Sequence, residues 1–120
     1  MKPKTMFDID SLEKNISSSE AKVSNLRPNI EKKILWADKI NQKTPKSIVF
    51  IHGFSATRVE LSPVIENVAK ALGANVFFTR LTGHGQDGDA LSNASFEEWI
   101  SDTKEAIRIG ETLGNEVILI

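Results

Sequence analysis

Short apolar runs alternate along this chain with longer stretches whose apolar residues recur at helical spacing. Residues 47–51, 75–79 and 117–120 each have an apolar centre without polar alternation. Uninterrupted runs of this length predict strands that are buried on both faces, as in a parallel sheet covered by helices. We therefore expect three buried strands, with the run at 47–51 at the centre of the sheet.

The intervals between these runs carry helix signals at both ends. The serine-proline pair at 62–63 predicts an N-cap and a first helical residue, and Gly73 predicts the C-terminal cap. The apolar face of this helix is expected to comprise Val64, Ile65, Val68, Ala69 and Leu72. In the next interval Ser95 and Glu98 match a capping box, and Gly114 ends the helix that they open. One side of that helix is expected to carry Phe96, Trp99, Ile100, Thr103, Ile107 and Leu113.

The N-terminal part of the chain has a weaker pattern. Residues 7–25 are polar, with apolar residues at loosely helical spacing, and fit either a marginal helix or a disordered arm. Residues 29–37 alternate in polarity and predict a half-exposed edge strand, joined by a short polar turn that allows an antiparallel return into the central strand. The apolar side of this strand consists of Ile30, Ile34 and Trp36. We thus expect a weakly structured arm, residues 1–28, and one α/β domain, residues 29–120.

Strands and helices alternate, which predicts a three-layer α/β fold with a mostly parallel sheet and helices on both faces. Such sheets bind ligands at the carboxyl ends of their strands. The central strand ends at His52 and Gly53, and residues 80–93 form a long loop after the next strand. Candidate chemistry is therefore expected where these two segments meet.

Composition narrows the function classes. The 120 residues include 15 Lys and Arg against 16 Asp and Glu, so the basic excess of a nucleic-acid-binding protein is missing. The chain contains no cysteine, which excludes disulfides, thiolate nucleophiles and cysteine metal sites. We expect no membrane span and no secretory signal, and a cytoplasmic location is favoured.

Two glycine and histidine patterns have weaker readings. Residues 83–88 match G-x-G-x-x-G, but the predicted helix opens several residues later, and the acidic residue that the dinucleotide motif requires would be Asp102 in mid-helix. His84 with two aspartates could suggest metal ligands, but no second cluster completes a coordination shell. Those aspartates are Asp87 and Asp89. We therefore expect neither a cofactor nor a metal.

A nucleophilic triad assembled from His52, Ser55 and Asp38 is also disfavoured. Ser55 follows His52 by three residues on one turn, and this spacing does not align the hydroxyl with the imidazole. Trp36 and Trp99 are most simply packing residues.

Taken together, two ordered motifs resemble the α/β-hydrolase superfamily, in its monoglyceride-lipase, serine-aminopeptidase and carboxylesterase branch. The first is His52-Gly53-Phe54 after a buried strand, and the second is L-T-G-H-G at residues 81–85 after the next strand. A helix with Trp99 and Asp102 near its start follows, as in that branch. The resemblance covers roughly residues 31–120.

The resemblance implies a role for each motif. The backbone N–H of Phe54 would donate one of two hydrogen bonds to a tetrahedral oxyanion, Gly53 would permit the turn, and His52 would brace the loop from beneath. The substrate pocket would be bordered by Phe54, Ser55, Gly83, His84 and Gly85. The simpler alternative is that Phe54 only covers the core. The implied substrate is a small ester or a lipid-like molecule.

One feature of that superfamily is missing. Its nucleophile lies in a G-x-S-x-G turn directly after the fifth strand, and this sequence ends at Ile120, the last residue of the corresponding strand. We therefore expect the N-terminal fragment of a serine hydrolase that is inactive alone. The alternative is a non-catalytic binding or interaction module whose last strand, residues 117–120, pairs with a partner.

Overall fold

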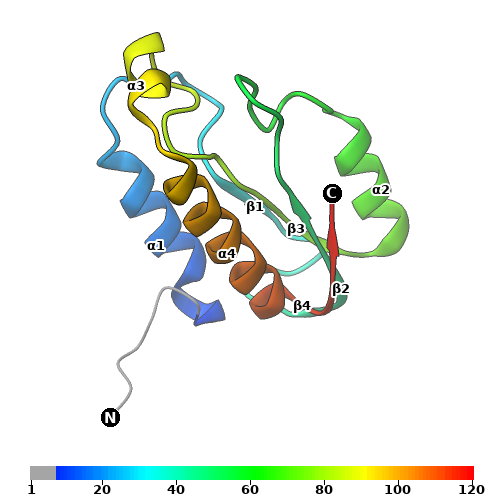
Figure 1. Ribbon diagram of the computed structural model, residues 1–120. Helices are drawn as coiled ribbons and strands as arrows, with labels where there is room; N and C mark the ends of the chain where they lie inside the picture. The colour runs from blue at the N-terminus through cyan, green and yellow to red at the C-terminus, as the bar shows by residue number, and fades with distance from the viewer. Residues whose placement is uncertain (1–7) are drawn as a thin grey trace.

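The computed structural model describes residues 8–120, and the expectations for residues 1–7 lie outside this part. Four strands form one sheet in the order β1-β3-β2-β4 (Figure 1). The strands are β1 (Lys33–Leu35), β2 (Thr44–Phe50), β3 (Asn75–Phe78) and β4 (Gly114–Leu119). The helices are α1 (Ile9–Ala21), α2 (Val64–Leu72), α3 (Gly88–Asn93) and α4 (Phe96–Leu113).

Strand β2 lies at the centre and pairs in parallel with both β3 and β4. Ile48, Val49 and Phe50 lie opposite Val76, Phe77 and Phe78, which confirms the predicted parallel pair. Strand β1 is an antiparallel edge strand, as expected, but it pairs with β3 and not with the central strand.

Asn75 explains this different pairing. Its side-chain oxygen accepts from the Ala37 N–H at 2.9 Å, and its side-chain nitrogen donates to the Gln42 carbonyl at 2.8 Å. The connector between β1 and β2 is thereby held across the beginning of β3, and β1 is left on the far side of β3. The predicted return of β1 beside β2 is therefore wrong.

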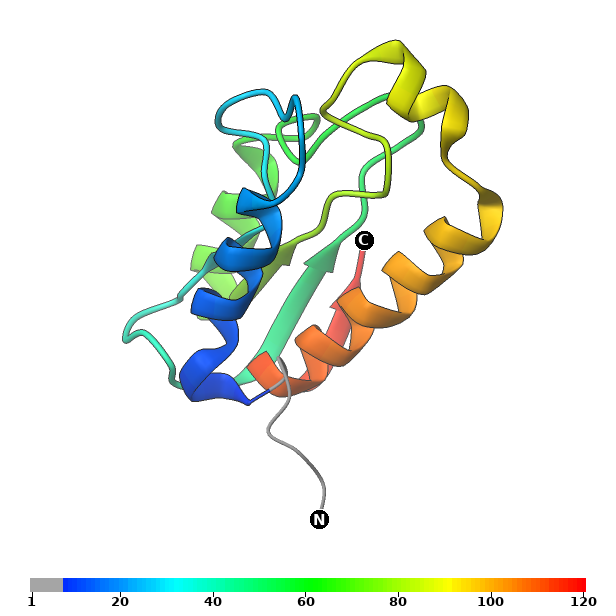
Figure 2. The same ribbon diagram turned by 90° about the vertical axis from the view of Figure 1, so that its left-hand side faces the viewer.

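The sheet carries a separate apolar core on each face, which confirms the three-layer α/β fold. Helices α1 and α4 lie side by side on one face, and α2 covers the other (Figure 2). The core beneath α1 and α4 contains Leu12, Ile16, Ile34, Val49, Phe77, Ala106, Ile109 and Leu113. The core beneath α2 contains Ile48, Phe50, Ile65, Ala69, Ala74, Val76 and Phe78.

Of the two alternatives for residues 7–25, the structure shows the helix: residues 9–21 form α1, so the expectation of a weakly structured arm is wrong for them. Asp8 caps this helix by accepting from the Asp10 N–H, and Leu12 and Ile16 are buried against the sheet. Tertiary packing explains the difference, because a helix with few apolar residues is stable when those few enter a core.

Helix α2 differs from its prediction in its start and its buried face. Pro63 occupies the N-cap position, and Ser62 instead donates its hydroxyl to Glu66. Ile65 and Ala69 are buried, but the other three predicted face residues, Val64, Val68 and Leu72, are exposed. The C-terminal cap is confirmed, since Gly73 has φ +62°, in the left-handed region that suits glycine.

The capping box of α4 is confirmed, because Ser95 and Glu98 each accept from the other's backbone N–H. Its buried face differs in part from the predicted one: Leu113 is buried as predicted, but Phe96 and Ile100 are exposed. The residues buried in this helix are Ala106, Ile109, Gly110 and Leu113. The loop predicted at residues 80–93 ends in a short helix, α3, capped by Asp87.

Strand β4 is an edge strand, so the expectation that residues 117–120 are buried on both faces is wrong. Leu119 and Ile120 are 53% and 43% exposed, because among the described residues β4 has a neighbour on one side only. No helix within residues 8–120 is long and apolar enough to cross a membrane.

Gly110 sets the distance between α4 and the sheet, which yields a test of this packing. A Cβ at this position would lie 2.4 Å from Val49 Cγ2, and Val49 is fully buried. We expect Gly110→Val to lower the free energy of unfolding by about 2 kcal/mol or more, as for other overpacked cores. Glycine and valine both have low helix propensity, so the loss reports the collision.

Urea unfolding measures this change. Ser101→Val introduces the same side chain at an exposed position of α4 and should stay within about 0.5 kcal/mol of the parent chain. Equal losses for the two variants would contradict the packing described here.

Candidate oxyanion loop and its supports

Two buried histidines join the loops that follow β2 and β3. His52, after β2, accepts at Nε2 from the Leu81 N–H at 3.0 Å, and His84, after β3, accepts at Nε2 from the Ser55 N–H at 2.9 Å. Each loop therefore supplies the imidazole that holds the other loop's backbone. The two side chains are 3% and 2% exposed, and their ring centroids lie 4.7 Å apart.

These contacts determine the tautomer of both rings. A backbone N–H can only donate, so each Nε2 is unprotonated and each proton resides on Nδ1. Nδ1 of His52 then donates to the Gly53 carbonyl at 2.9 Å, and Nδ1 of His84 faces the Thr82 carbonyl at 3.4 Å. Burial lowers the pKa of His52, and the nearby His84 lowers it further, so the neutral ring is favoured.

The backbone N–H groups of the turn at residues 52–56 differ in their hydrogen bonding. The Gly53 N–H donates to Glu60 Oε1 at 2.9 Å, and the Ser55 N–H is bonded to His84. The Phe54 N–H between them has no acceptor within residues 8–120. Ser55 has φ +64°, which is uncommon for a residue with a side chain and marks a constrained turn.

Helix α4 holds the second loop at Thr82. Asp102 accepts from both the N–H and the hydroxyl of Thr82, at 2.6 and 2.7 Å, and Trp99 Nε1 donates to the Thr82 carbonyl at 2.8 Å. The Trp99 ring also meets the rings of Phe54 and His84 edge to face, at 5.8 and 5.6 Å. Trp99 is therefore more than the packing residue that its sequence context suggested.

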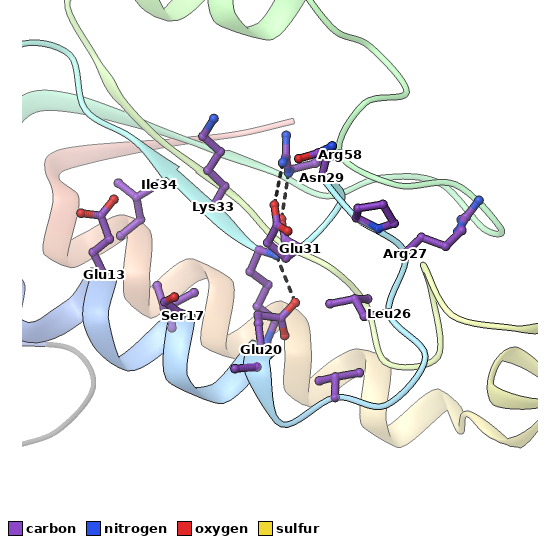
Figure 3. Close-up of a pocket in the computed structure, with 15 residues that line it drawn as sticks. Glu13, Ser17, Glu20, Leu26, Arg27, Asn29, Glu31, Lys33, Ile34 and Arg58 are labelled. Atoms are coloured by element: carbon purple, nitrogen blue, oxygen red, sulfur yellow. Dashed lines mark hydrogen bonds and ion pairs between the residues drawn. The ribbon is translucent and has the colours of Figure 1, made fainter.

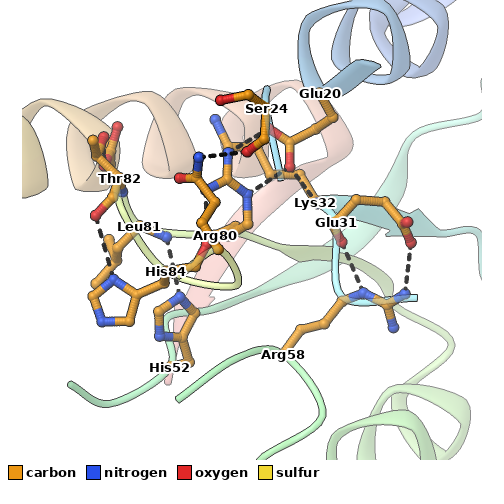
Figure 4. Close-up of polar contacts among 12 residues, drawn as sticks. Glu20, Ser24, Glu31, Lys32, His52, Arg58, Arg80, Leu81, Thr82 and His84 are labelled. Atoms are coloured by element: carbon orange, nitrogen blue, oxygen red, sulfur yellow. Dashed lines mark hydrogen bonds and ion pairs between the residues drawn. The ribbon is translucent and has the colours of Figure 1, made fainter. Parts of the chain in front are cut away.

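A buried ion pair supports the same loop from the other side. Arg80 binds Glu20 through two hydrogen bonds of 2.8 and 2.9 Å and donates a third to the His84 carbonyl at 3.0 Å (Figure 4). Burial alone would raise the pKa of Glu20, but the bonds from Arg80 and from the Lys32 N–H outweigh it and lower the pKa.

Sequence reasoning did not single out Glu20, Glu60 or Arg80. An arginine directly after a buried strand signals that a buried partner is needed, which could have drawn attention to Arg80. No comparable signal marks Glu20 or Glu60, because both lie in polar stretches far from their partners in sequence.

The predicted border residues partly gather around one small cavity. A cavity of about 240 Å³ is lined by Ser55, Gly83, His84 and Gly85, together with Arg27 and the beginning of α3. A larger hollow, about 630 Å³, lies between α1 and residues 23–34 and contains none of these predicted site residues (Figure 3). Charged side chains, among them Glu13, Glu31 and Arg58, line much of it.

The structure also places the residues of the disfavoured dinucleotide motif, metal site and triad. Helix α3 does begin at Gly88, earlier than expected, but the Asp87 carboxylate already occupies its N-terminus by accepting from the Ala90 N–H. Within residues 8–120 no group of three or more metal-ligating side chains is assembled. Asp38 follows Ala37, which is bonded at the beginning of β3, at the opposite end of the sheet from His52.

The chain can now be compared with known proteins. It is 33% identical over 61 residues to a thermostable monoacylglycerol lipase of Bacillus sp. (strain H-257), a match that covers 51% of this chain and 24% of that protein. A solved structure described with LipS and LipT, two metagenome-derived lipolytic enzymes, superposes with a TM-score of 0.67 at 22% identity. That match covers 78% of this chain and 36% of the other. No protein-family model matches the sequence.

These findings confirm the relationship to the α/β hydrolases that the two motifs indicated. The relationship is partial, since the chain spans about a quarter to a third of the length of the proteins it matches. The fold is that of a partial α/β hydrolase, with a mostly parallel open sheet.

The neutral state of His52 makes stability depend on pH. The pKa of His52 is lowered from 6.5 in the folded chain, so below about pH 6.5 the unfolded chain binds a proton that the folded chain does not. The contribution of neutral His52 to the free energy of unfolding is therefore fully present above this pH. It falls as the pH drops, by at most about 1.4 kcal/mol per pH unit.

Gln in place of His52 keeps an acceptor near the Nε2 position and does not titrate. We expect His52→Gln to show a smaller loss of unfolding free energy than the parent between pH 7.5 and 5.5, measured by urea unfolding. His84 is present in both proteins, and the pKa of Glu20 is lowered from 4.5 and so lies below this window, so neither residue accounts for the difference. Identical pH profiles would show that His52 does not bind as a neutral acceptor.

Proposed function

We propose that this chain supplies the N-terminal part of a serine hydrolase of the α/β fold, which hydrolyses carboxylic esters or amides in the manner of esterases and lipases. The observation that carries the proposal is the Phe54 N–H at the carboxyl end of β2, which has no acceptor among the residues that the structure describes. The amides on either side of it are occupied, by Glu60 and by His84. One donor is thus left available in an otherwise saturated turn.

The chemistry of acyl transfer needs such a donor. Attack on an ester carbonyl places negative charge on its oxygen, and a preorganised N–H aimed at that charge lowers the barrier by about 3 kcal/mol. Because its supports are already bonded, the Phe54 peptide would not need to reorganise during the reaction. In this proposal Gly53 permits the turn and His52 supports it, and neither residue is assigned a role in proton transfer.

The substrate class is inferred from the relatives. The curated match is a monoacylglycerol lipase and the structural match is lipolytic, which favours an ester with a lipid-like acyl chain. Phe54, 72% exposed, would present its ring to such a chain, and Ser55, Gly83, His84 and Gly85 would border the pocket.

The remaining machinery would come from outside this chain. The nucleophile, the acid, the base and the second oxyanion donor of a serine hydrolase follow the strand that corresponds to β4. We therefore propose that the chain alone is inactive. No observation favours the alternative of a binding module that pairs through residues 117–120.

Extension of the chain tests this proposal. We expect the coding sequence beyond residue 120 to specify G-x-S-x-G within a few residues, and the extended protein to hydrolyse p-nitrophenyl esters. The 120-residue chain should show no hydrolysis that a serine-directed inhibitor abolishes. Turnover by the 120-residue chain would contradict the proposed division, and an inactive extended protein would contradict the proposed function.

Two substitutions of Phe54 in the extended protein test the donor itself. Phe54→Pro removes the N–H and should lower kcat by about 100- to 1000-fold, as for the loss of one oxyanion donor. Phe54→Ala keeps the N–H and should lower kcat by less than about tenfold. Equal effects would assign the contribution to the ring. Thermal unfolding of both variants verifies that they are folded.

A further inference from the structure

The N-terminal helix contacts the loop after β3 through a continuous chain of polar bonds. Glu20, in the last turn of α1, binds Arg80 with two hydrogen bonds, and Arg80 donates to the His84 carbonyl. The His84 ring then accepts from the Ser55 N–H, next to the free amide of Phe54. Three bonded steps thus lead from α1 to the turn after β2, and Figure 4 shows Glu20, Arg80 and His84, which form the first two.

We propose that Glu20 is a positioning residue for the oxyanion loop, so that α1 helps to set the geometry of the site. This inference rests on the proposed function, because it assigns a role to Glu20 in that same site. Glu20 acts through Arg80 and His84, and it contacts neither Phe54 nor the cavity beside Ser55.

The burial of the Glu20–Arg80 pair makes the loss of either partner costly. Glu20 and Arg80 are 5% and 6% exposed, so the pair is largely shielded from water, although Glu20 also lines the hollow beside α1. Oε2 of Glu20 also accepts from the Lys32 N–H at 3.1 Å, so both carboxylate oxygens are bonded. Removal of one member of a buried pair leaves the other charge uncompensated. Arg80 would then have to leave its position, and its bond to the His84 carbonyl would be lost.

The segment after α1 is hydrogen-bonded to the same loop. The Arg27 N–H donates to the Gly85 carbonyl at 2.8 Å, and the Gln86 side chain donates to the Ser24 carbonyl at 2.8 Å. A Cβ at Gly85, where φ is +77°, would lie 2.1 Å from Cδ1 of Ile30. Gly85 is thus packed against Ile30 without space for a further carbon atom, and the two hydrogen bonds couple the loop to the segment after α1.

Native-state hydrogen exchange of the 120-residue chain tests this role. Glu20→Gln removes the charge and keeps the shape, and Glu13→Gln makes the same change at an exposed site of α1. We expect Ser55 and Leu81 amides to exchange at least about tenfold faster in Glu20→Gln, relative to the core amides of Val49 and Phe77. That factor corresponds to the loss of about one hydrogen bond. Glu13→Gln should leave these ratios unchanged.

Uniform acceleration of loop and core amides would overturn the inference, because it would show a role in global stability only. If Glu20→Gln does not fold, the double variant Glu20→Leu with Arg80→Met removes both charges and leaves neither unpaired. It should give the same increase in the Ser55 ratio, and an unchanged ratio would equally overturn the inference.

These measurements need no catalysis. An inactive extended protein would remove the proposed function but would leave a selective loosening of Ser55 in place as a structural result. An active extended protein whose Ser55 exchange does not respond to Glu20 would remove only the inference about α1.

Discussion

The reciprocal bonds that His52 and His84 make with the opposite loops are the constraint on which the rest of the site depends: His52 accepts from the Leu81 N–H and His84 from the Ser55 N–H. Parallel strands place their carboxyl ends at one edge of a sheet, but nothing in strand pairing fixes the loops beyond them. Here each loop donates a backbone N–H to an imidazole of the other. Because both rings are buried and neutral, the bonds form without the free-energy penalty of burying a charge.

This constraint explains why a single amide is left available. With Ser55 held by His84 and Gly53 held by Glu60, the peptide between them has little freedom, and its N–H has no acceptor within the described chain. A donor that is both fixed and unused suits the stabilisation of developing negative charge, since no reorganisation precedes the reaction.

Charged groups support this neutral centre from a distance. Asp102 binds Thr82 from α4, and the Glu20–Arg80 pair binds the His84 carbonyl from the side of α1. Buried ion pairs contribute little to stability on average but are intolerant of losing one member. They are thus suited to defining one loop conformation. We infer that the Glu20–Arg80 pair links α1 to the loop for this purpose.

Local pattern was sufficient for the strands, for α2 and α4, and for the two motifs. Apolar runs located the three parallel strands, the capping box located the beginning of α4, and the His-Gly-Phe and L-T-G-H-G motifs indicated the superfamily. These features depend on neighbouring residues, whose steric and hydrogen-bonding preferences act over a few positions. The role of the Phe54 N–H as an oxyanion donor stays a prediction.

Tertiary structure alone decided the partners. The pairing of β1 with β3, the buried faces of α2 and α4, and the folding of α1 follow from packing between segments far apart in the chain. Glu20 and Arg80 are 60 residues apart, and no periodicity or spacing in the sequence links them. The reason is physical: the sequence by itself determines which groups are available to bond, whereas burial, which makes each bond obligatory, exists only after the sheet and its helices have assembled.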